Sequence, residues 1–259
     1  MTETVIEVRG LRTQFGTHVV HEALDLDVYR GEILGVVGGS GTGKSVLLRI
    51  IAGLLVPQAG QVTMLGTDIL HGAEAAQAAI GHRIGVMFQD GALFSSLTVC
   101  ENVEVPLRAI KELDPATREA LARLKISLAG LPWSAGDKYP SELSGGMRKR
   151  AGLARALALD PEIVFLDEPT AGLDPIGAAD FDLLIRKLSK TLGLTVFLVT
   201  HDLDTLHAVC DRVAVLAERK VLVTGTMEDM LKVDHPWVKE YFQGPRARAA
   251  QVPQAAGTS

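Results

Sequence analysis

Hydrophobic residues follow two different patterns along the chain. At 5–8 and 24–28 apolar and polar residues alternate, which is typical of an antiparallel sheet with one buried face. Four later segments are almost unbroken apolar runs: 33–37, 84–88, 163–166 and 195–199. Such runs are typical of parallel strands that are buried on both faces. Helical stretches at 44–55 and 146–159 separate the runs, so the pattern predicts an α/β core with right-handed crossovers.

The region between the second and third apolar runs, about 91–144, has helical patterning and four prolines but no strong strand. We therefore expect an inserted helical subdomain there. Further on, the apolar segments 213–216 and 221–224 flank the four residues 217–220 and predict a hairpin. The last fifteen residues, 245–259, have no apolar periodicity and are expected to be disordered.

These patterns predict three parts of the chain. Residues 1–90 and 155–235 form the α/β core with its antiparallel β subdomain, residues 91–154 form the helical subdomain, and residues 236–259 form a C-terminal extension that is partly disordered.

Composition and charge narrow the class of protein. The 259 residues are 47% hydrophobic, which is typical of a globular chain. The net charge of −5 argues against a free-standing nucleic-acid binder. Two cysteines make no disulfide framework, and no Cys/His spacing predicts a zinc site. No apolar run reaches the ~20 residues of a membrane span, and the opening residues do not resemble a secretory signal, so we expect a cytoplasmic protein.

A glycine-rich segment follows the first apolar run and opens a helix. It fits the P-loop pattern G-x-x-x-x-G-K-[ST] and consists of Gly38, Gly39, Ser40, Gly41, Thr42, Gly43, Lys44 and Ser45, with Val46 next in the helix. The glycines let backbone N–H groups surround a phosphate at the positive end of the helix. Lys44 is expected to reach the β and γ phosphates, and the Ser45 hydroxyl is expected to bind Mg²⁺. The alternative, a chance glycine-rich turn, is disfavoured by the strand-loop-helix context.

The other three apolar runs each end in polar residues: Gln89, the pair Asp167 and Glu168, and His201. Ligands bind beyond the carboxyl ends of parallel strands, so these side chains should converge on the nucleotide. Taken singly, Gln89 or His201 is more often a strand-end polar residue without a role. Together with a P-loop they predict a nucleotide site.

The neighbouring acids Asp167 and Glu168 are expected to have different roles, because adjacent strand residues point to opposite sides. Asp167 follows the strand as a Mg²⁺-supporting carboxylate does in P-loop NTPases, which leaves Glu168 to polarise the attacking water. The alternative is two solvated acids at the start of a turn before Pro169.

A second candidate anion site lies at the start of the helix predicted at 146–159. Ser144 is a good N-cap, and Gly145 and Gly146 leave backbone N–H groups bare at the helix N-terminus. The chain has only one P-loop. A head-to-tail homodimer would let each 144–146 segment close the nucleotide that the partner's P-loop holds.

These motifs resemble the ATP-binding-cassette (ABC) ATPase family over almost the whole chain. They follow the family's order: the P-loop, Gln89 of the Q-loop, the signature Leu143-Ser144-Gly145-Gly146-Met147, Asp167 and Glu168 of Walker B, Asp174 of the D-loop and His201 of the H-loop. The resemblance implies a P-loop NTPase (RecA-like) parallel core, an N-terminal antiparallel β subdomain and an inserted α-helical subdomain.

The resemblance also implies roles for single residues. Lys44, Gln89, Glu168 and His201 would serve ATP hydrolysis, and Ser45, Gln89 and Asp167 would bind Mg²⁺. Nucleotide contacts would come from the P-loop with Val46, the signature, Asp174 and an aromatic residue. Phe15 stands where the family usually has an adenine-stacking tyrosine, so stacking is kept and a hydroxyl contact is lost. Met147 replaces the commoner glutamine of the signature.

Three further strings, at 88–94, 102–108 and 140–147, resemble the ATPase subunit of Mla/Mce-type lipid transporters. That resemblance implies phospholipid movement between inner and outer membranes, with the ATPase bound through a permease at the cytoplasmic face of the inner membrane. It also implies integral-membrane permease subunits, a periplasmic Mce-type lipid-binding subunit and a small cytoplasmic regulatory subunit. The segment after the Q-loop would contribute to the groove that receives a permease coupling helix.

Two other functions stay open. One is a transporter ATPase for another solute, such as an amino acid or a metal complex. The other is an ABC ATPase without transport, which is disfavoured because residues 46–142 hold no sustained heptads and the chain has a single G-K-S. The cluster Arg148, Lys149, Arg150 and Arg155 is expected to be a solvated helix face or a support for the signature, and no nucleic-acid partner is expected.

Overall fold

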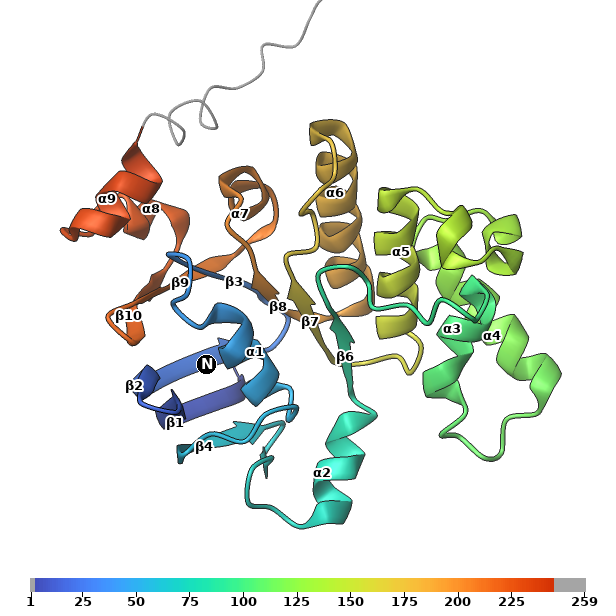
Figure 1. Cartoon of the computed structure of the whole chain (residues 1–259), viewed down its shortest axis with the longest axis horizontal. Helices are drawn as coiled ribbons and strands as arrows, with labels where there is room; N and C mark the ends of the chain where they lie inside the picture. The colour runs from blue at the N-terminus through green and yellow to red at the C-terminus, as the bar shows by residue number, and fades with distance from the viewer. Residues whose placement is uncertain (1–2, 245–259) are drawn as a thin grey trace, which may run out of the picture.

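The computed structural model describes residues 3–244 and contains two sheets (Figure 1). The smaller sheet has the order β2-β1-β4-β5 and is antiparallel throughout. Its strands are β1 (Thr4–Phe15), β2 (His18–Tyr29), β4 (Ala59–Met64) and β5 (Thr67–Asp68). The expected antiparallel sheet near the N-terminus is confirmed, and both of its first strands are longer than the alternating segments. The disorder expected at 245–259 lies outside the described residues.

The larger sheet has the order β10-β9-β3-β8-β7-β6. Its strands are β3 (Ile33–Gly38), β6 (Ile84–Met87), β7 (Ile163–Asp167), β8 (Thr195–Val199), β9 (Arg212–Ala217) and β10 (Lys220–Gly225). All neighbours pair in parallel except the edge strand β10, which runs antiparallel to β9. Every residue of β3, β7 and β8 is buried. The predicted α/β fold is confirmed. Burial on both faces holds for three of the four predicted strands but is wrong for β6, which alternates between half-buried and buried residues because it lies at the sheet edge.

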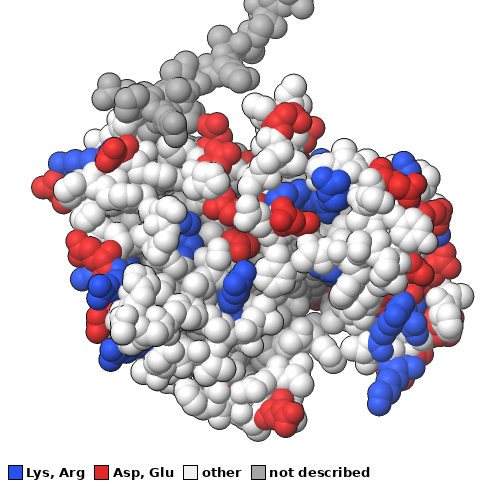
Figure 2. Space-filling model, in the orientation of Figure 1, with Lys and Arg blue, Asp and Glu red and all other residues white. Residues whose placement is uncertain are grey.

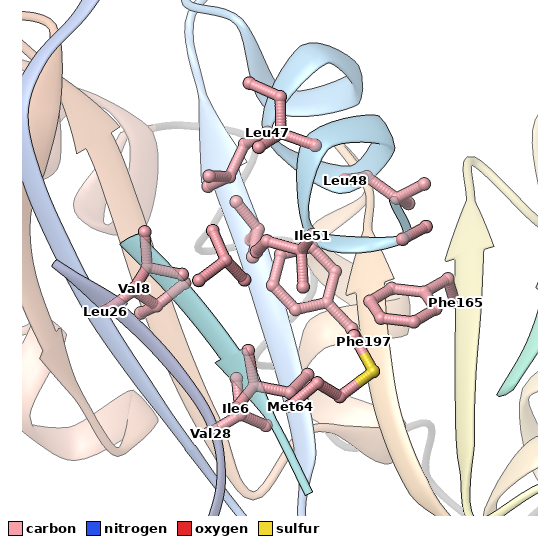
Figure 3. Packing of buried hydrophobic residues seen from close by; sticks show 14 of the residues in the cluster. Ile6, Val8, Leu26, Val28, Leu47, Leu48, Ile51, Met64, Phe165 and Phe197 are labelled. Carbon is pink, nitrogen blue, oxygen red and sulfur yellow. The ribbon is translucent and has the colours of Figure 1, made fainter. Parts of the chain in front are cut away.

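The helix α1 (Lys44–Ile51) joins the two sheets into one core (Figures 1 and 3). It packs Leu47, Leu48 and Ile51 between the antiparallel sheet and the tilted ring pair of Phe165 and Phe197, whose centroids lie 5.7 Å apart. The helix ends at Ile51 rather than at residue 55 as the pattern predicted, because the chain turns at Gly53 with φ 73°.

The helical region is confirmed and has a hydrophobic cluster of its own, which includes Val103, Ile126 and Ala151. Its elements are α3 (Val99–Leu107), α4 (Pro115–Leu128), two short 3-10 helices (Trp133–Asp137 and Pro140–Glu142) and α5 (Gly145–Ala156). The helix α5 also sends Leu153 into a cluster with β7 and β8, so it is shared between the helical region and the sheet.

The remaining helices lie between strands or after the last one: α2 (Glu74–Gly81), α6 (Pro175–Leu192), α7 (Leu203–Val209), α8 (Met227–Met230) and α9 (Pro236–Gln243). The hydrophobic pattern did not indicate these helices, although α9 falls in the expected C-terminal extension. Within residues 3–244, the helices are all too short or too polar to cross a membrane.

The hairpin β9-β10 forms, but the predicted four-residue connection is wrong. Two residues connect the strands, Glu218 with φ 51° and Arg219 with φ 66°. Consecutive positive φ values match the right-handed twist of the paired strands, which is why tight hairpins use them. Neither residue is glycine or asparagine, so no turn-forming residue type indicated a two-residue connection.

His21 is buried behind the glycine-rich loop. It lies on β2 with an exposed fraction of 0%, and a Cβ on Gly43 would meet its Nε2 at 2.5 Å. Burial lowers the pKa of His21 to about 4 because the charged imidazole loses its hydration. The imidazole is therefore neutral at physiological pH.

Asp182 is a buried acid on α6. It is 3% exposed, and its Oδ2 accepts a hydrogen bond from the Thr205 hydroxyl at 2.9 Å. Burial raises the pKa of Asp182 to about 6, with a smaller contribution from the like charges of Asp202 and Asp204 and opposition from the Thr205 bond. This acid and His21 therefore titrate in the same pH range with opposite effects.

Stability should depend on pH through these two groups with opposite signs. Below about pH 6.5 the unfolded chain protonates His21 and the folded chain does not, so this group makes stability rise between about pH 4 and 6.5. Above about pH 4 the unfolded chain loses the Asp182 proton that the folded chain keeps up to about pH 6, so this group makes stability fall. From pH 4 to pH 7, the stability of His21→Leu relative to the parent should fall by roughly 3 kcal/mol. That of Asp182→Asn should rise by roughly 2 kcal/mol.

Urea unfolding at a series of pH values measures both differences. The exposed residues His82 and Asp180 supply the matched controls His82→Leu and Asp180→Asn, whose stability relative to the parent should not change with pH in this way. If the free energy of unfolding of His21→Leu and Asp182→Asn changes with pH in the same way as that of the parent, these two groups do not cause the pH dependence.

Candidate nucleotide-binding site

The glycine-rich loop lies between β3 and α1. A Cβ on Gly38, the last residue of β3, would meet the Leu216 carbonyl oxygen at 2.4 Å, so only glycine fits there. Gly43 is the N-cap of α1 with φ 92°, a conformation that favours glycine. The loop therefore delivers uncovered backbone N–H groups at a helix N-terminus, where an anion is favoured.

Lys44 is the first residue of α1, and its side chain folds back over the loop. Its Nζ donates to the carbonyl oxygens of Gly38 at 2.9 Å and Gly39 at 3.1 Å. Burial lowers the pKa of Lys44, and the charges of Glu168 and Asp167 oppose that shift. The Lys44 ammonium thus lies beside the loop and close to two carboxylates. A bound phosphate can accept its hydrogen bonds in place of the Gly38 and Gly39 carbonyls.

Ser45 and Asp167 meet across the site. The Ser45 Oγ donates to the Asp167 Oδ1 at 2.9 Å, and Asp167 is 5% exposed at the end of β7. Hydroxyl and carboxylate oxygens are the ligands that Mg²⁺ prefers. In the described part of the chain, no group of three or more His, Cys, Asp or Glu side chains could hold a metal alone. The pair fits an ion that takes its other ligands from phosphate and water, and bound Mg²⁺ would neutralise phosphate charge.

Glu168 leaves the strand in a left-handed conformation, with φ 50°. Its N–H donates to the Val199 carbonyl at 2.8 Å, and its Oε2 lies 2.7 Å from the Nδ1 of His201. Asp167 and Glu168 do point to different partners, as expected. The cause is this backbone turn and not the alternation of a strand, because β7 ends at Asp167.

Gln89 follows β6 with an exposed side chain. Within residues 3–244 that side chain makes no hydrogen bond, but the Gln89 carbonyl accepts one from the Lys149 ammonium. Lys149 also donates to the Glu168 carbonyl at 3.0 Å. The structure therefore connects Gln89 to the other strand ends through its backbone.

The signature segment lies at the start of α5, beside the D-loop of the same chain. Ser144 is the N-cap, and its Oγ accepts from the Met147 N–H at 3.2 Å. Nothing lies within 4 Å of a Cβ on Gly145, and a Cβ on Gly146 would meet Leu173 at 3.8 Å. Among the residues described, no hydrogen bond joins this segment to the P-loop.

The other predicted contact residues are placed as follows. Asp174 is the N-cap of α6 and accepts from the Gly177 N–H at 2.9 Å. Leu143 and Met147 pack against the helical cluster, and Val46 packs against the main core. Phe15 ends β1 with 51% of its surface exposed, so its ring is free to stack on a base.

Only part of the basic cluster on α5 is a solvated face, because Arg148 is exposed, Arg150 and Arg155 are half-buried and Lys149 is buried. Each of its four cations donates to backbone carbonyls: Arg148 to Leu143, Lys149 to Gln89 and Glu168, Arg150 to Ala129, and Arg155 to Gly91 and Ala92. The expectation of a solvated face holds for Arg148 and is wrong for Lys149, Arg150 and Arg155, because α5 packs against loops whose carbonyls need donors. The alternative, support for the signature, fits Arg148.

Sequence reasoning also missed the C-terminal helix as part of the site. The Tyr241 hydroxyl donates to the His201 carbonyl at 2.9 Å, and Trp237 stacks on Tyr241 with ring centroids 4.8 Å apart. The Trp237 Nε1 would lie 3.6 Å from a Cβ on Gly39. The aromatic residues of α9 were the only available sign, and they did not indicate a partner.

The geometry fits phosphoryl transfer to water. A cation and bare N–H groups lie at the loop, an oxygen pair suited to Mg²⁺ lies beside them, and a carboxylate and an imidazole lie next along the sheet edge. Catalysis of that reaction consists mainly of positioning and charge stabilisation.

Comparison with known proteins decides the family. The ABC transporter family model matches residues 21–171. The chain belongs to the ABC transporter family. It is an ATPase that uses ATP with Mg²⁺, and ABC ATPases of this type act as dimers with membrane permease subunits.

Its relatives have different named substrates. The chain is 40% identical, over 93% of its length and 69% of the relative, to a probable ribonucleotide transport ATP-binding protein of Mycobacterium leprae. It is 36% identical, over 94% of its length and 92% of the relative, to the intermembrane phospholipid transport ATP-binding protein MlaF of Haemophilus influenzae. It is also 38% identical, over 96% of its length and 67% of the relative, to the methionine import ATP-binding protein MetN of Corynebacterium efficiens.

The fold is similar to solved ATP-binding cassettes. The dimeric structure of a cassette in a post-hydrolysis state bound to ADP and Pi matches with a TM-score of 0.78 and 29% identity, and the match covers 85% of this chain and 98% of the other. The P-loop NTPase core with its two added subdomains is therefore the family's fold.

Glu168→Gln should lower ATP turnover by about 10² to 10⁴-fold while ATP still binds, because an amide cannot take the proton of the attacking water. Phosphate release measures turnover, and ATP titration measures binding. Glu228→Gln, which changes an exposed glutamate, should match the parent. Near-normal hydrolysis by Glu168→Gln would show that another residue is the base.

Proposed function

We propose that this chain is the ATP-hydrolysing subunit of a transporter that moves phospholipid between the inner and outer membranes. The observation that supports it best is the match to the phospholipid transport relative, which runs through 92% of that relative and 94% of this chain. The ribonucleotide and methionine relatives match over 69% and 67% of their lengths. A transporter for another solute, such as an amino acid, is the second candidate because of the methionine import relative.

The proposed mechanism assigns one task to each group of the site. The P-loop N–H groups and Lys44 bind the β and γ phosphates, and Phe15 stacks on adenine. Ser45, Asp167 and Gln89 would hold Mg²⁺, which would supply positive charge next to the phosphates. Glu168 takes the proton of the attacking water, and His201 orients Glu168 through the contact at 2.7 Å.

We propose that the signature acts across the dimer. Ser144, Gly145 and Gly146 present an open helix N-terminus, and Asp174 lies near this face through its neighbour Leu173. Neither segment is hydrogen-bonded to the P-loop within the described residues. In a head-to-tail homodimer this face closes on the nucleotide that the partner's P-loop holds.

Mixed dimers test the trans assignment. A Lys44→Ala subunit paired with a Ser144→Arg subunit places both lesions in one site and leaves the other site intact, so the mixture should hydrolyse more ATP than either variant alone. Differently tagged subunits allow the mixed dimer to be isolated for phosphate-release assays. If nucleotide contacts are damaged equally in both sites of the mixed dimer, the signature acts within its own subunit.

A surface groove beside the Q-loop is the proposed permease contact. A cavity of about 220 Å³ lies between β6 and the helical region, lined by residues that include Gly85, Val86, Pro106 and Arg155. Figure 2 shows the surface hollowed at this position, between α2 and the helical region. Arg155 lies over the ring of Phe94, which is 52% exposed.

Phe94 is the better candidate for the contact than its neighbour. Leu93 packs against the helical cluster, so a charge there would disturb the fold, whereas Phe94 presents half of its surface. The apolar ring beside the groove suits a coupling helix of an integral-membrane permease, which would hold the ATPase at the cytoplasmic face of the inner membrane. A periplasmic Mce-type lipid-binding subunit and a small cytoplasmic regulatory subunit complete the proposed complex.

Copurification from native membranes tests both the contact and the substrate. The parent should recover permease subunits, and mass spectrometry should find phospholipid in the complex. Phe94→Glu should lose the permease or uncouple ATP hydrolysis from transport while the subunit still binds ATP and unfolds at the parental temperature. Leu183→Glu changes an apolar residue of α6 that is 67% exposed and outside the groove, and it should keep the permease.

The outcomes separate the alternatives. Recovery of an amino-acid permease without phospholipid would overturn the lipid assignment and leave the ATPase assignment intact. Full permease recovery with coupled hydrolysis by Phe94→Glu would move the contact elsewhere.

A further inference from the structure

Lys149 is buried at the junction of three elements. It lies on α5 and is 5% exposed. Its Nζ donates to the backbone carbonyls of Gln89, which follows β6, and of Glu168, which follows β7. One ammonium group therefore joins the helix that begins with the signature to two strand ends of the nucleotide site.

The backbone of α5 packs closely against the segment 89–92, so the Lys149 side chain can reach the Gln89 carbonyl. A Cβ on Gly152 would lie 2.8 Å from the Gly91 Cα, so no larger residue fits between helix and loop. Arg155, one turn further along α5, donates to the Gly91 and Ala92 carbonyls at 2.8 Å each. The segment 89–92 is thus held on α5 by two cations, and of these two only Lys149 also holds the strand end of β7.

The bond to the Glu168 carbonyl acts on a residue whose backbone is unfavourable. With φ at 50°, a residue that has a side chain stays in this conformation only where its surroundings fix it. The Val199 carbonyl fixes its N–H at 2.8 Å and Lys149 fixes its C=O at 3.0 Å. These two bonds fix the backbone from which the Glu168 side chain extends, and its carboxylate lies 2.7 Å from the His201 Nδ1.

We propose that Lys149 is a positioning residue for ATP hydrolysis: it holds the backbone of Glu168 so that the carboxylate meets the attacking water, and it ties that carboxylate to the segment after Gln89. The proposal rests on the proposed role of Glu168 as the base. Lys149 acts through Glu168 and touches no reacting atom, so it should affect turnover more than ATP affinity.

Lys149→Met tests the proposal, because methionine keeps the apolar stem and removes all donors. We expect kcat to fall by about 10 to 100-fold, the size of effect that misplacing a catalytic group produces. KM and the Kd for ATP should stay within about threefold of the parent's values, because a residue that acts only in the chemical step lowers kcat without weakening substrate binding. Lys125→Met is a matched control: Lys125 is 4% exposed on α4 and bonds to Asp160, away from the site. Its kcat should equal the parent's.

A double variant separates positioning from a general structural effect. If Lys149 acts through Glu168, adding Lys149→Met to Glu168→Gln should change the residual kcat by less than about twofold, because coupled residues are not additive. Single-turnover phosphate release from the purified dimer measures the low rates. Multiplied losses in the double variant, or a kcat of Lys149→Met within threefold of the parent's, would overturn the proposal.

Folding and base assignment are controlled separately. If Lys149→Met shows no cooperative thermal unfolding, Lys149→Gln replaces it. Its neutral side chain is one atom shorter, so kcat should fall by about three to tenfold at unchanged KM. A folded Gln variant with kcat within twofold of the parent's would refute the role. Near-normal turnover by Glu168→Gln would show that Glu168 is not the base. An active Lys149→Met together with an inactive Glu168→Gln would instead leave Glu168 as the base and refute only the role of Lys149.

Discussion

Glu168 occupies a left-handed backbone conformation directly after a buried strand. Such a conformation costs about 1–3 kcal/mol for a residue with a side chain. Three contacts fix it here: the N–H bonds to Val199, the carbonyl accepts from Lys149, and the carboxylate meets His201. The partners come from β8, from α5 and from the segment after β8. The sheet, the shared helix and the histidine segment must therefore all be in place before this one residue can take its position.

The parts of the molecule that could be predicted from the sequence are those with local signals. Apolar runs identified four parallel strands, of which β3, β8 and β7 are central and β6 is at the edge of the sheet, and the glycine spacing identified the phosphate loop. The convergence of polar strand ends followed from topology, since parallel neighbours such as β7 and β8 pair in register, with Asp167 opposite Val199. Ser45 and Asp167, which are 122 residues apart, were each expected at Mg²⁺, Ser45 from the P-loop pattern and Asp167 from its place after a strand, and their contact agrees with both expectations.

The rest depended on partners that no local pattern shows. Lys149 shares one face of α5 with Gly152, Leu153 and Ala156, all of them buried, and that spacing could have indicated a buried lysine. Its acceptors, however, are backbone carbonyls 60 and 19 residues away, and every residue type has a carbonyl. The tight β9-β10 turn was missed for a related reason, because two ordinary residues adopt positive φ only under the constraint of the paired strands.

The bond from Tyr241 to the His201 carbonyl has a consequence for how the protein is made. Tyr241 lies on α9, forty residues after His201. A chain leaves the ribosome with its N-terminus first, so the phosphate loop and the central strands emerge before Tyr241 has been added. The histidine segment receives its anchor only near the end of synthesis. An unfinished or truncated chain without α9 lacks the tether on this histidine.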